Sequence, residues 1–589
     1  MKTLFVDYLD LFTVVNILYK HSEYDEIRLI SDPKFLSKLW NSILALFGVK
    51  IYQENFFFGN IFNSKKESIY LDSQRIASEK ALEYSAWLLE GSHFSKLGKL
   101  DSHGKKVLKL FISKTVWDEM VYFTRRIMYV RHVYPERTNY FISIRTPRFI
   151  STEYLENSFE NFNFNFNNTN RILIIKKYIS SLIKKGLRFK YFFLINKKTK
   201  NKKSIVTIAV DTISLNTKKK AFPNCFEKKG NRDFYILNLN NFKVNISKKN
   251  LEKNNIIILN CKNYFFYASN KRKLKLSNSY RIPQILKLDI KIFLNLANGI
   301  DNLLGELNCE KFIFSDPQDQ LTDAVQINSK ETSFETICIQ YSNIGMKVPL
   351  MMTMADRFLT FSDIYNKVFT WKDIRPNKFD PIGYSVKIDD NSLYKIKLNL
   401  SNKGVKKIIV YFDESIQNDK WGLISEQQYL NHLNILAKTV IKNNHIAIIL
   451  KPQFVFNSIN RFKSQIIRKA LETGRFIELN RGSYRNSYTP SNVSQIADYC
   501  IGDLVGATAA LEFAISNKKA LLINPHGYIT EFQSLYNKCN IVFPSLKKAI
   551  DSILKNEKDA GDWSKIIHNF NTFNNVKKTG RIQKILAQR

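Results

Sequence analysis

The stretch between Asp498 and Glu512 combines small, hydroxyl and acidic residues in a way that suits an anion site. Gly506 and Ala509 would let a ligand approach the backbone. Thr508 can cap a helix that begins there and bond a phosphate oxygen. The first N–H groups of such a helix, together with the positive end of its dipole, attract an anion. Glu512, one turn further on, is expected to be an exposed cleft carboxylate that accepts hydrogen bonds from ribose hydroxyls.

A purely structural interpretation of the same residues stays open. Thr508 would then be an ordinary helix cap, Glu512 a first-turn helix charge, and the alanines simple packing. The stretch is not a phosphate loop of the G-x-x-x-x-G-K-[ST] kind. Lys451, which precedes a proline at the end of an apolar run, could place a point charge on phosphates or could be structural.

The second half of the chain must position these residues, and it alternates short apolar runs with amphipathic stretches. The expected strands include 405–413, 445–450 and 519–524, and the expected helices include 425–443, 459–474 and 507–516. Buried strands that alternate with helices of this length predict a parallel, doubly wound sheet over 375–560. Open sheets of this kind bind ligands beyond the carboxyl ends of their strands, where Thr508 falls.

The first half is less regular. Apolar runs at 3–8, 26–31, 311–316 and 335–341 predict strands, and 73–134 predicts mainly helix. We expect one Rossmann-like lobe over 1–374, interrupted by an insertion or mobile loop at about 154–204, where Phe and Asn alternate before lysine-rich stretches. The tail, 561–589, is expected to pack back across the lobes.

Composition limits the partners. The formal charge is +38, from 90 Lys and Arg against 52 Asp and Glu, but the lysines are scattered along the chain, so we do not expect nucleic acid as a partner. An anionic membrane surface is compatible with that charge. The six cysteines form no C-x-x-C pair, which is typical of free thiols in a reducing compartment. The expected location is the cytoplasm, with a peripheral contact at the inner membrane face as an open option.

The second half resembles the C-terminal lobe of GT-B glycosyltransferases, especially those that assemble bacterial capsule and lipopolysaccharide glycans. The matching pieces are VYFDES, ILKPQ, IADYCIGDLVGATAALEFA, LLINP and GDWSKIIHNF, and the resemblance spans roughly 311–570. The family pattern of an aspartate, an apolar strand, small or hydroxyl residues and a helix with a glutamate falls on Asp498, Thr508 and Glu512. QYSN, residues 340–343, resembles a first-lobe QHG-like strand end, but it lacks the His and the Gly, which leaves its role open.

The resemblance implies an α/β fold of two Rossmann-like lobes with a nucleotide-sugar cleft between them. It also implies a glycosyltransferase that moves a hexosyl, sialyl or Kdo-like sugar from a nucleotide-sugar donor to a surface-glycan or lipid-linked acceptor. The donor phosphates would lie at the helix start near Gly506, Thr508 and Ala509, with the ribose near Glu512 and with Lys451 close to the phosphates.

The reaction itself is less well defined by the sequence. The leaving phosphate would be stabilised by the helix terminus and basic side chains, so we expect no cofactor and no metal requirement. The eight histidines show no paired metal-ligand spacing. An inverting enzyme also needs a general base, for which Asp7, Asp316 and Asp356 are candidates at first-lobe strand ends.

Two other functions stay open. A nucleotide-sugar epimerase can use the same two-lobe fold, because one fold hosts several chemistries. A non-catalytic, basic binding protein could retain the fold without a donor site. An acceptor requirement would separate the first alternative from a transferase, and donor binding would separate the second.

Overall fold

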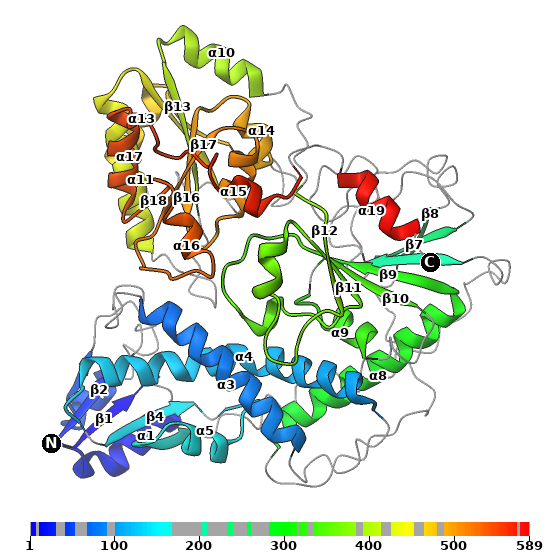
Figure 1. Cartoon of the computed structure of the whole chain (residues 1–589). Helices are drawn as coiled ribbons and strands as arrows, with labels where there is room; N and C mark the ends of the chain where they lie inside the picture. The colour runs from blue at the N-terminus through cyan, green and yellow to red at the C-terminus, as the bar shows by residue number, and fades with distance from the viewer. Residues whose placement is uncertain are drawn as a thin grey trace.

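The computed structural model describes most of the chain and shows three parallel sheets within the part it describes (Figure 1). The described residues are 2–6, 11–30, 42–53, 68–90, 100–137, 139–145, 147–167, 203–208, 232–238, 256–260, 282–315, 317–327, 334–384, 393–413, 426–452, 464–479, 488–573 and 578–587. Each pair of neighbouring strands within these sheets is parallel. Parallel sheets need crossover connections, which helices supply here.

The N-terminal unit is a five-stranded sheet in the order β3-β2-β1-β4-β5. Its strands are β1 (Thr3–Val6), β2 (Glu26–Leu29), β3 (Ile51–Gln53), β4 (Tyr140–Arg145) and β5 (Phe162–Asn167). Its helices are α1 (Leu11–Lys20), α3 (Ile69–Glu90), α4 (Ser102–Val133) and α5 (Thr152–Ser158). Asp101 caps the longest of them, because its Oδ1 accepts a hydrogen bond from the N–H of Gly104 at 2.6 Å.

Strand β5 corrects one expectation. The alternating Phe and Asn residues are expected to form an insertion or mobile loop, yet Phe162–Asn167 pairs with β4 along its whole length. Alternation with a period of two is the pattern of a strand, and the phenylalanine rings of Phe162, Phe164 and Phe166 stack along one face. The later part of that predicted insertion, 168–202, lies outside the described residues.

The second unit is a seven-stranded sheet in the order β12-β11-β10-β9-β6-β7-β8. Its strands are β6 (Ser204–Ile208), β7 (Asp233–Asn238), β8 (Ile256–Asn260), β9 (Cys309–Phe314), β10 (Glu335–Ile339), β11 (Arg357–Thr360) and β12 (Lys378–Pro381). Its helices are α8 (Gln284–Glu306) and α9 (Gln320–Gln326), with short 3-10 turns η6 (Pro349–Met351) and η7 (Asp363–Lys367).

This second sheet changes the domain picture in two respects. The range 1–374, expected to form one lobe, holds two separate sheets. Strand β12 pairs with β11, so residues 378–381 belong to this seven-stranded sheet, and not to the C-terminal lobe predicted to begin at 375. The seven-stranded sheet and the six-stranded sheet that follows it form the two main lobes. Sequence pattern identifies a strand from its own residues, whereas sheet membership depends on which distant strand lies beside it.

The third unit is a six-stranded sheet in the order β15-β14-β13-β16-β17-β18. Its strands are β13 (Lys407–Phe412), β14 (Ile446–Lys451), β15 (Phe476–Glu478), β16 (Tyr499–Asp503), β17 (Lys519–Ile523) and β18 (Val542–Phe543). Its helices are α10 (Tyr394–Asn402), α11 (Glu426–Lys442), α13 (Gln465–Glu472), α14 (Pro490–Ser494), α15 (Thr508–Ile515), α16 (Gln533–Tyr536) and α17 (Leu546–Leu554). The central strands β13 and β14 are continuously buried apart from Lys407, as expected of strands with helices on both faces.

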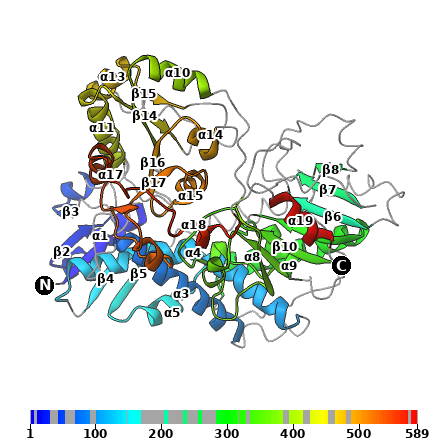
Figure 2. The ribbon, with the colours of Figure 1, turned by 45° about the horizontal axis from the view of Figure 1, so that its top comes forward.

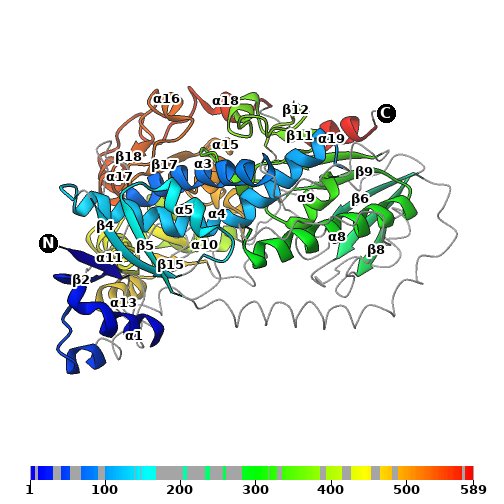
Figure 3. The ribbon, with the colours of Figure 1, turned by 90° about the horizontal axis from the view of Figure 1, so that it is seen from below.

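Helices α3 and α4 run along one another and join the N-terminal unit to the seven-stranded lobe (Figure 3). Phe111 of α4 stacks on Phe293 of α8 with ring centroids 3.9 Å apart. Lys114 of α4 forms a buried ion pair of 2.7 Å with Asp323 of α9. The N-terminal unit is therefore packed onto the lobe through both apolar and charged contacts.

The C-terminal tail returns to the seven-stranded lobe. Trp563 still packs in the six-stranded lobe, where its Nε1 donates to the carbonyl of Ala520 at 2.7 Å. After the short helix α18 (Ile567–Phe570), helix α19 (Lys578–Ala587) lies against the seven-stranded sheet (Figure 2). Ile582 and Leu586 of α19 are buried among isoleucines of that sheet.

Candidate functional site

The start of α15 lies at the carboxyl edge of the six-stranded sheet. Strand β16 ends at Asp503, and α15 begins at Thr508 after a turn that contains Gly506. The cap residue is Ala507, which provides no side-chain cap, so Thr508 is the first helical residue and not the cap that was expected. Gly506, Thr508 and Ala509 are partly exposed at this turn.

The hydroxyl of Thr508 contacts the opposite lobe. Its Oγ1 accepts a hydrogen bond of 2.8 Å from the N–H of Asn343 and lies 3.0 Å from Oγ of Ser342. Both partners follow β10, so the carboxyl edges of the two sheets meet at this point. The QYSN segment, whose role the sequence left open, therefore faces the predicted anion site.

The loop after β10 is held rigidly. The Gln340 side chain accepts a hydrogen bond from the N–H of Phe361 at 2.8 Å and donates to the carbonyl of Ser342 at 2.9 Å. Asn343 accepts a hydrogen bond of 2.8 Å from the hydroxyl of the buried Tyr365. Gln340 and Asn343 are themselves buried. These hydrogen bonds fix the position of the groups that meet Thr508.

Glu512 is buried, which contradicts the expectation of an exposed carboxylate. It is only 2 % exposed. It accepts hydrogen bonds from the hydroxyl of Tyr384 at 2.7 Å, from the hydroxyl of Ser491 at 2.6 Å and from the N–H of Ser491 at 3.1 Å. Burial, with the Glu512 charge adding to it, holds the pKa of Tyr384 well above its usual value. Glu512 thus fixes α15 to α14 and to the segment that joins the two lobes.

Lys451 is the last residue of β14, and β13 separates that strand from β16. Its side chain is buried, and its Nζ donates to the carbonyl of Pro452 at 3.1 Å. The structure therefore brings Gly506, Thr508 and Ala509 together and places Lys451 at the same sheet edge, two strands away.

Of the three candidate bases, Asp7 and Asp316 lie outside the described residues. Asp356 immediately precedes β11, so it lies at the amino end of that strand, opposite the edge that meets Thr508. Its Oδ2 accepts hydrogen bonds from the hydroxyl of Thr336 at 2.7 Å and from its N–H at 2.9 Å. Asn377 donates to Oδ1 at 2.9 Å. These contacts make Asp356 a link between neighbouring strands.

Sequence reasoning missed a buried group of ionisable residues at the carboxyl edge. Asp503 ends β16, and His526 lies in the loop after the neighbouring strand β17; both are buried. Burial raises the pKa of Asp503, while the nearby His526 lowers it. His432 of α11, bonded through Nδ1 to the hydroxyl of Tyr411 at 2.8 Å, has its pKa lowered to about 4 by burial and by His526. Asp503 ends an apolar run and His526 lies shortly after another, and this position is the sequence signal that could have revealed them.

The loop that carries His526 also contacts the other two units. The carbonyl of His526 accepts a hydrogen bond of 2.8 Å from the N–H of Ser68, just before α3. Further along, Arg75 of α3 donates to the carbonyl of Ile529 at 3.0 Å. Glu531 donates its N–H to the carbonyl of Gly345 in the seven-stranded lobe at 2.8 Å. This loop is therefore the meeting point of all three sheets' units.

The described residues lack two other features that would point to a different kind of site. They contain no group of three or more His, Cys, Asp or Glu side chains placed to hold a metal ion. None of the helices they form is both long enough and apolar enough to cross a membrane.

Comparisons with known proteins give similarity only to solved structures. No protein-family profile matches the chain, and a search of curated proteins finds no match. A putative UDP-N-acetylglucosamine 2-epimerase from Listeria monocytogenes is 12% identical over 65% of this chain and 94% of that one, with a TM-score of 0.40. A glycosyltransferase from Rickettsia africae is 13% identical over 66% and 100%, with a TM-score of 0.38. The lipopolysaccharide outer core galactosyltransferase WaaB is 12% identical over 65% and 99%, with a TM-score of 0.37.

Because these three TM-scores lie below 0.5, the fold assignment rests on the chain's own sheets. The seven-stranded and six-stranded sheets are parallel, are flanked by helices, and meet at their carboxyl edges through Thr508 and the loop after β10. The chain therefore has two Rossmann-like lobes, the architecture of GT-B enzymes, together with a five-stranded α/β unit that precedes them.

Proposed function

We propose that this protein is a glycosyltransferase that moves a sugar from a nucleotide-sugar donor to a glycan or lipid-linked acceptor. The observation that carries the proposal is the turn of Gly506, Thr508 and Ala509 at the start of α15, which faces Ser342 and Asn343 across the two lobes. Parallel sheets bind ligands beyond their carboxyl edges, and a helix start at that edge suits the phosphates of a donor.

The donor phosphates accept hydrogen bonds from first-turn N–H groups of α15, which lack partners within a helix. The Thr508 hydroxyl donates to the same phosphates after its bond to Ser342 has been exchanged. Lys451, at the end of β14, adds positive potential from the same edge. No metal is required in this scheme, because the helix terminus and basic side chains offset the charge that develops on the leaving phosphate.

Glu512 is given a positioning role in place of the ribose contact expected from sequence. It accepts three hydrogen bonds from Tyr384 and Ser491, so it sets the position of α15 and of the turn before it.

An epimerase on the same fold is the alternative, and one of the similar structures is a putative epimerase. The two activities differ in a measurable way. A transferase releases nucleotide from its donor rapidly only when an acceptor is present, whereas an epimerase converts the sugar nucleotide alone. Incubation with each sugar nucleotide, with and without a membrane-glycan extract as acceptor, separates them by product analysis. Conversion without any acceptor would overturn the transferase assignment.

Donor binding is tested by thermal-shift measurements of the purified protein against UDP-, GDP-, dTDP- and CMP-sugars. A ligand at one hundred times its dissociation constant stabilises the fold by about 2.7 kcal/mol. Thr508→Val should weaken donor binding by about tenfold or more, because a hydrogen bond to a charged group contributes about 1.5–3 kcal/mol. The matched control is Thr439→Val on α11, whose hydroxyl bonds only the carbonyl of Ile435 among its described partners. If none of the sugar nucleotides raises the melting temperature, a non-catalytic binding protein is favoured.

We also propose that α10 is the part of the protein that contacts an anionic membrane surface. Tyr394 and Leu398 are large hydrophobic residues of α10 that are 58% and 47% exposed. Lys395 and Lys397 are exposed on the same short helix. Exposed apolar side chains beside lysines suit a surface of acidic headgroups over acyl chains, and such a contact would bring the protein close to a lipid-linked acceptor.

A further inference from the structure

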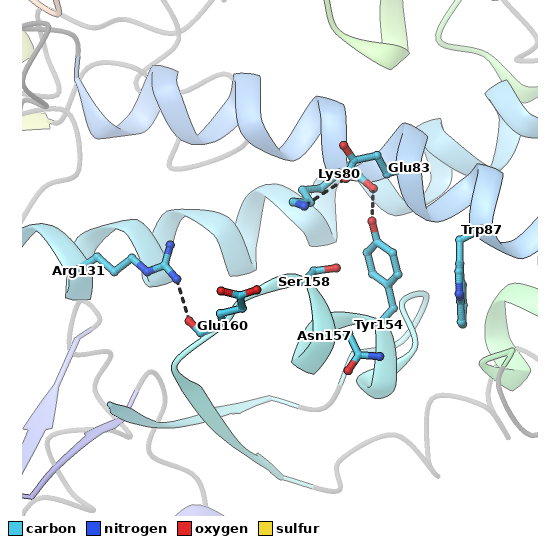
Figure 4. Close-up of a pocket in the computed structure, with 8 residues that line it drawn as sticks. All are labelled: Lys80, Glu83, Trp87, Arg131, Tyr154, Asn157, Ser158 and Glu160. Atoms are coloured by element: carbon cyan, nitrogen blue, oxygen red, sulfur yellow. Dashed lines mark hydrogen bonds and ion pairs between the residues drawn. The ribbon is translucent and has the colours of Figure 1, made fainter. Parts of the chain in front are cut away.

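A pocket of about 580 Å³ lies in the N-terminal unit, where α3, α4 and α5 come together (Figure 4). Its lining combines aromatic, cationic, acidic and amide or hydroxyl side chains, supplied by Lys80, Glu83, Trp87, Arg131, Tyr154, Asn157, Ser158 and Glu160. This volume is in the range of pockets that bind small organic ligands. None of these residues belongs to the contact between the two main lobes.

Two aromatic rings form a fixed wall of the pocket. Trp87 and Tyr154 pack with ring centroids 5.6 Å apart, and Tyr154 also packs on the buried Tyr84 at 4.7 Å. The hydroxyl of Tyr154 donates to the carbonyl of Lys80 at 3.2 Å, which sets the ring's orientation. Burial raises the pKa of Tyr154 to about 12, so the ring stays neutral. A neutral, rigid aromatic surface can pack against an apolar ligand face at little cost in conformational entropy.

Charged groups of both signs surround this wall. Lys80 forms an ion pair of 3.1 Å with Glu83, in which the two side chains are 29% and 46% exposed. Arg131 donates to the backbone carbonyl of Glu160 at 2.8 Å (Figure 4). Two cations and two carboxylates give the lining no net formal charge. The pocket can therefore donate and accept hydrogen bonds without favouring a strongly charged ligand.

We propose that this pocket binds a neutral sugar unit of a glycan. The hydroxyl groups of a pyranose need both donors and acceptors, which the lysine, arginine, carboxylates, Asn157 and Ser158 supply. The less polar C–H face of the ring needs a flat apolar partner, which the partly exposed Trp87 supplies, with the buried Tyr154 packed against it. A neutral carbohydrate requires this combination of an apolar aromatic wall and a polar rim that has no net charge.

The position of the pocket along α3 gives it a place in the reaction. The helix begins at Ile69, next to the bond between Ser68 and His526, and Trp87 is near its other end. At 1.5 Å per residue, Trp87 lies about 28 Å along the helix from that bond. The pocket is thus an acceptor-anchoring subsite remote from the donor site, an assignment that rests on the proposed function, whereas sugar binding by itself does not.

Saturation-transfer difference NMR on the full chain tests the proposal. The probes are the methyl glycosides of glucose, galactose, mannose and N-acetylglucosamine, together with N-acetylneuraminic acid as an anionic sugar. At least one neutral glycoside should give saturation transfer from the wild-type protein. Trp87→Ala and Asn157→Ala should each weaken that binding by about tenfold or more. Tyr19→Ala, which removes an exposed aromatic ring on α1, should leave it unchanged.

The proposal is overturned if no neutral glycoside binds, if the anionic sugar binds in preference, or if both pocket variants bind as the wild type does. Asn157→Ala guards against a folding defect in Trp87→Ala, because Asn157 is exposed. Thermal shift by sugar nucleotides should be preserved in Trp87→Ala. Absence of that shift in the wild type would refute the proposed function while leaving the pocket's sugar binding to be judged on its own.

Discussion

Glu512 and Tyr384 are 128 positions apart in the sequence, yet the Tyr384 hydroxyl donates a 2.7 Å hydrogen bond to the Glu512 carboxylate in a buried site. Tyr384 follows the last strand of the seven-stranded lobe, and Glu512 lies on α15 of the six-stranded lobe. The carboxylate therefore ties the candidate donor site to the point where the chain leaves one lobe for the other.

Glu512→Ala should destabilise the fold. The substitution leaves the hydroxyls of Tyr384 and Ser491 buried without their acceptor, and each such loss costs about 1–3 kcal/mol. We expect the free energy of unfolding in urea to fall by about 3 kcal/mol. Glu79→Ala, at an exposed position on α3, should change it by less than about 0.5 kcal/mol. Equal midpoints for Glu512→Ala and the wild type would show that the carboxylate does not hold the lobes together.

The pH dependence of stability should reveal His432. Its pKa is lowered to about 4 in the folded protein, from an ordinary value of 6.5. As the pH falls below 6.5, His432 takes up a proton in the unfolded chain before it does so in the folded protein. The free energy of unfolding is therefore highest above pH 6.5 and decreases toward pH 4. The loss amounts to about 3 kcal/mol. His432→Asn, which keeps an acceptor for Tyr411, should remove this loss, whereas His568→Asn at an exposed site should retain it.

The decrease in the free energy of unfolding due to His432 must be measured as the difference between wild type and variant. Asp323 makes the free energy of unfolding change with pH in the opposite direction. Burial raises the pKa of Asp323 to about 6, against the attraction of Lys114. Its contribution is therefore present below its unfolded value of 3.8 and is lost as the pH rises through about 6. A wild-type profile that is flat between pH 4 and 6.5 would be consistent with both groups, but identical profiles for wild type and His432→Asn would refute the prediction for His432.

Sugar transfer should not depend on a divalent metal. With the helix terminus and basic side chains offsetting the phosphate charge, an excess of EDTA should change the initial rate by less than about twofold. The rate of nucleotide release in the presence of acceptor is the measurement. Loss of activity in EDTA that Mg²⁺ or Mn²⁺ restores would show that the site needs a metal.

The membrane contact should depend on the lysines of α10. Removing two lysines that each contribute about 1 kcal/mol near an anionic surface weakens binding by about thirtyfold. Lys395→Ala combined with Lys397→Ala should therefore reduce cosedimentation with vesicles of phosphatidylglycerol and phosphatidylethanolamine. Lys547→Ala with Lys548→Ala on α17 is the matched control, since both are exposed. Equal losses in the two double variants would indicate that overall charge, and not α10, governs the contact.

The sequence predicted the parts of the fold that local pattern determines. The runs at 405–413, 445–450 and 519–524 correspond to β13, β14 and β17, because strands buried on both faces are continuously apolar. The helix start near Thr508 was also placed correctly, apart from a one-residue error in the cap.

What the sequence could not predict depends on partners far along the chain. Phe162–Asn167 becomes a strand because β4 offers it an edge, and the separation into a five-stranded and a seven-stranded sheet depends on the same kind of pairing. Glu512 is buried because Tyr384 and Ser491 cover it, and no residue near it in sequence signals that Tyr384 will do so. The pair of Asp503 and His526 is likewise assembled by two adjacent strands.

The chain passes between the two main lobes twice, once after Tyr384 and once at α18, from which the tail continues through Asn571 toward α19. These two crossings are joined to each other, since the N–H of Tyr384 donates to the Asn571 side chain at 2.7 Å. Two lobes joined by a single segment can rotate about several axes. Two adjacent connecting segments that are bonded to each other restrict the rotation to one main axis. If the two lobes move apart, we therefore expect a rotation about the line through Tyr384 and Asn571, with the tail as the second half of the hinge.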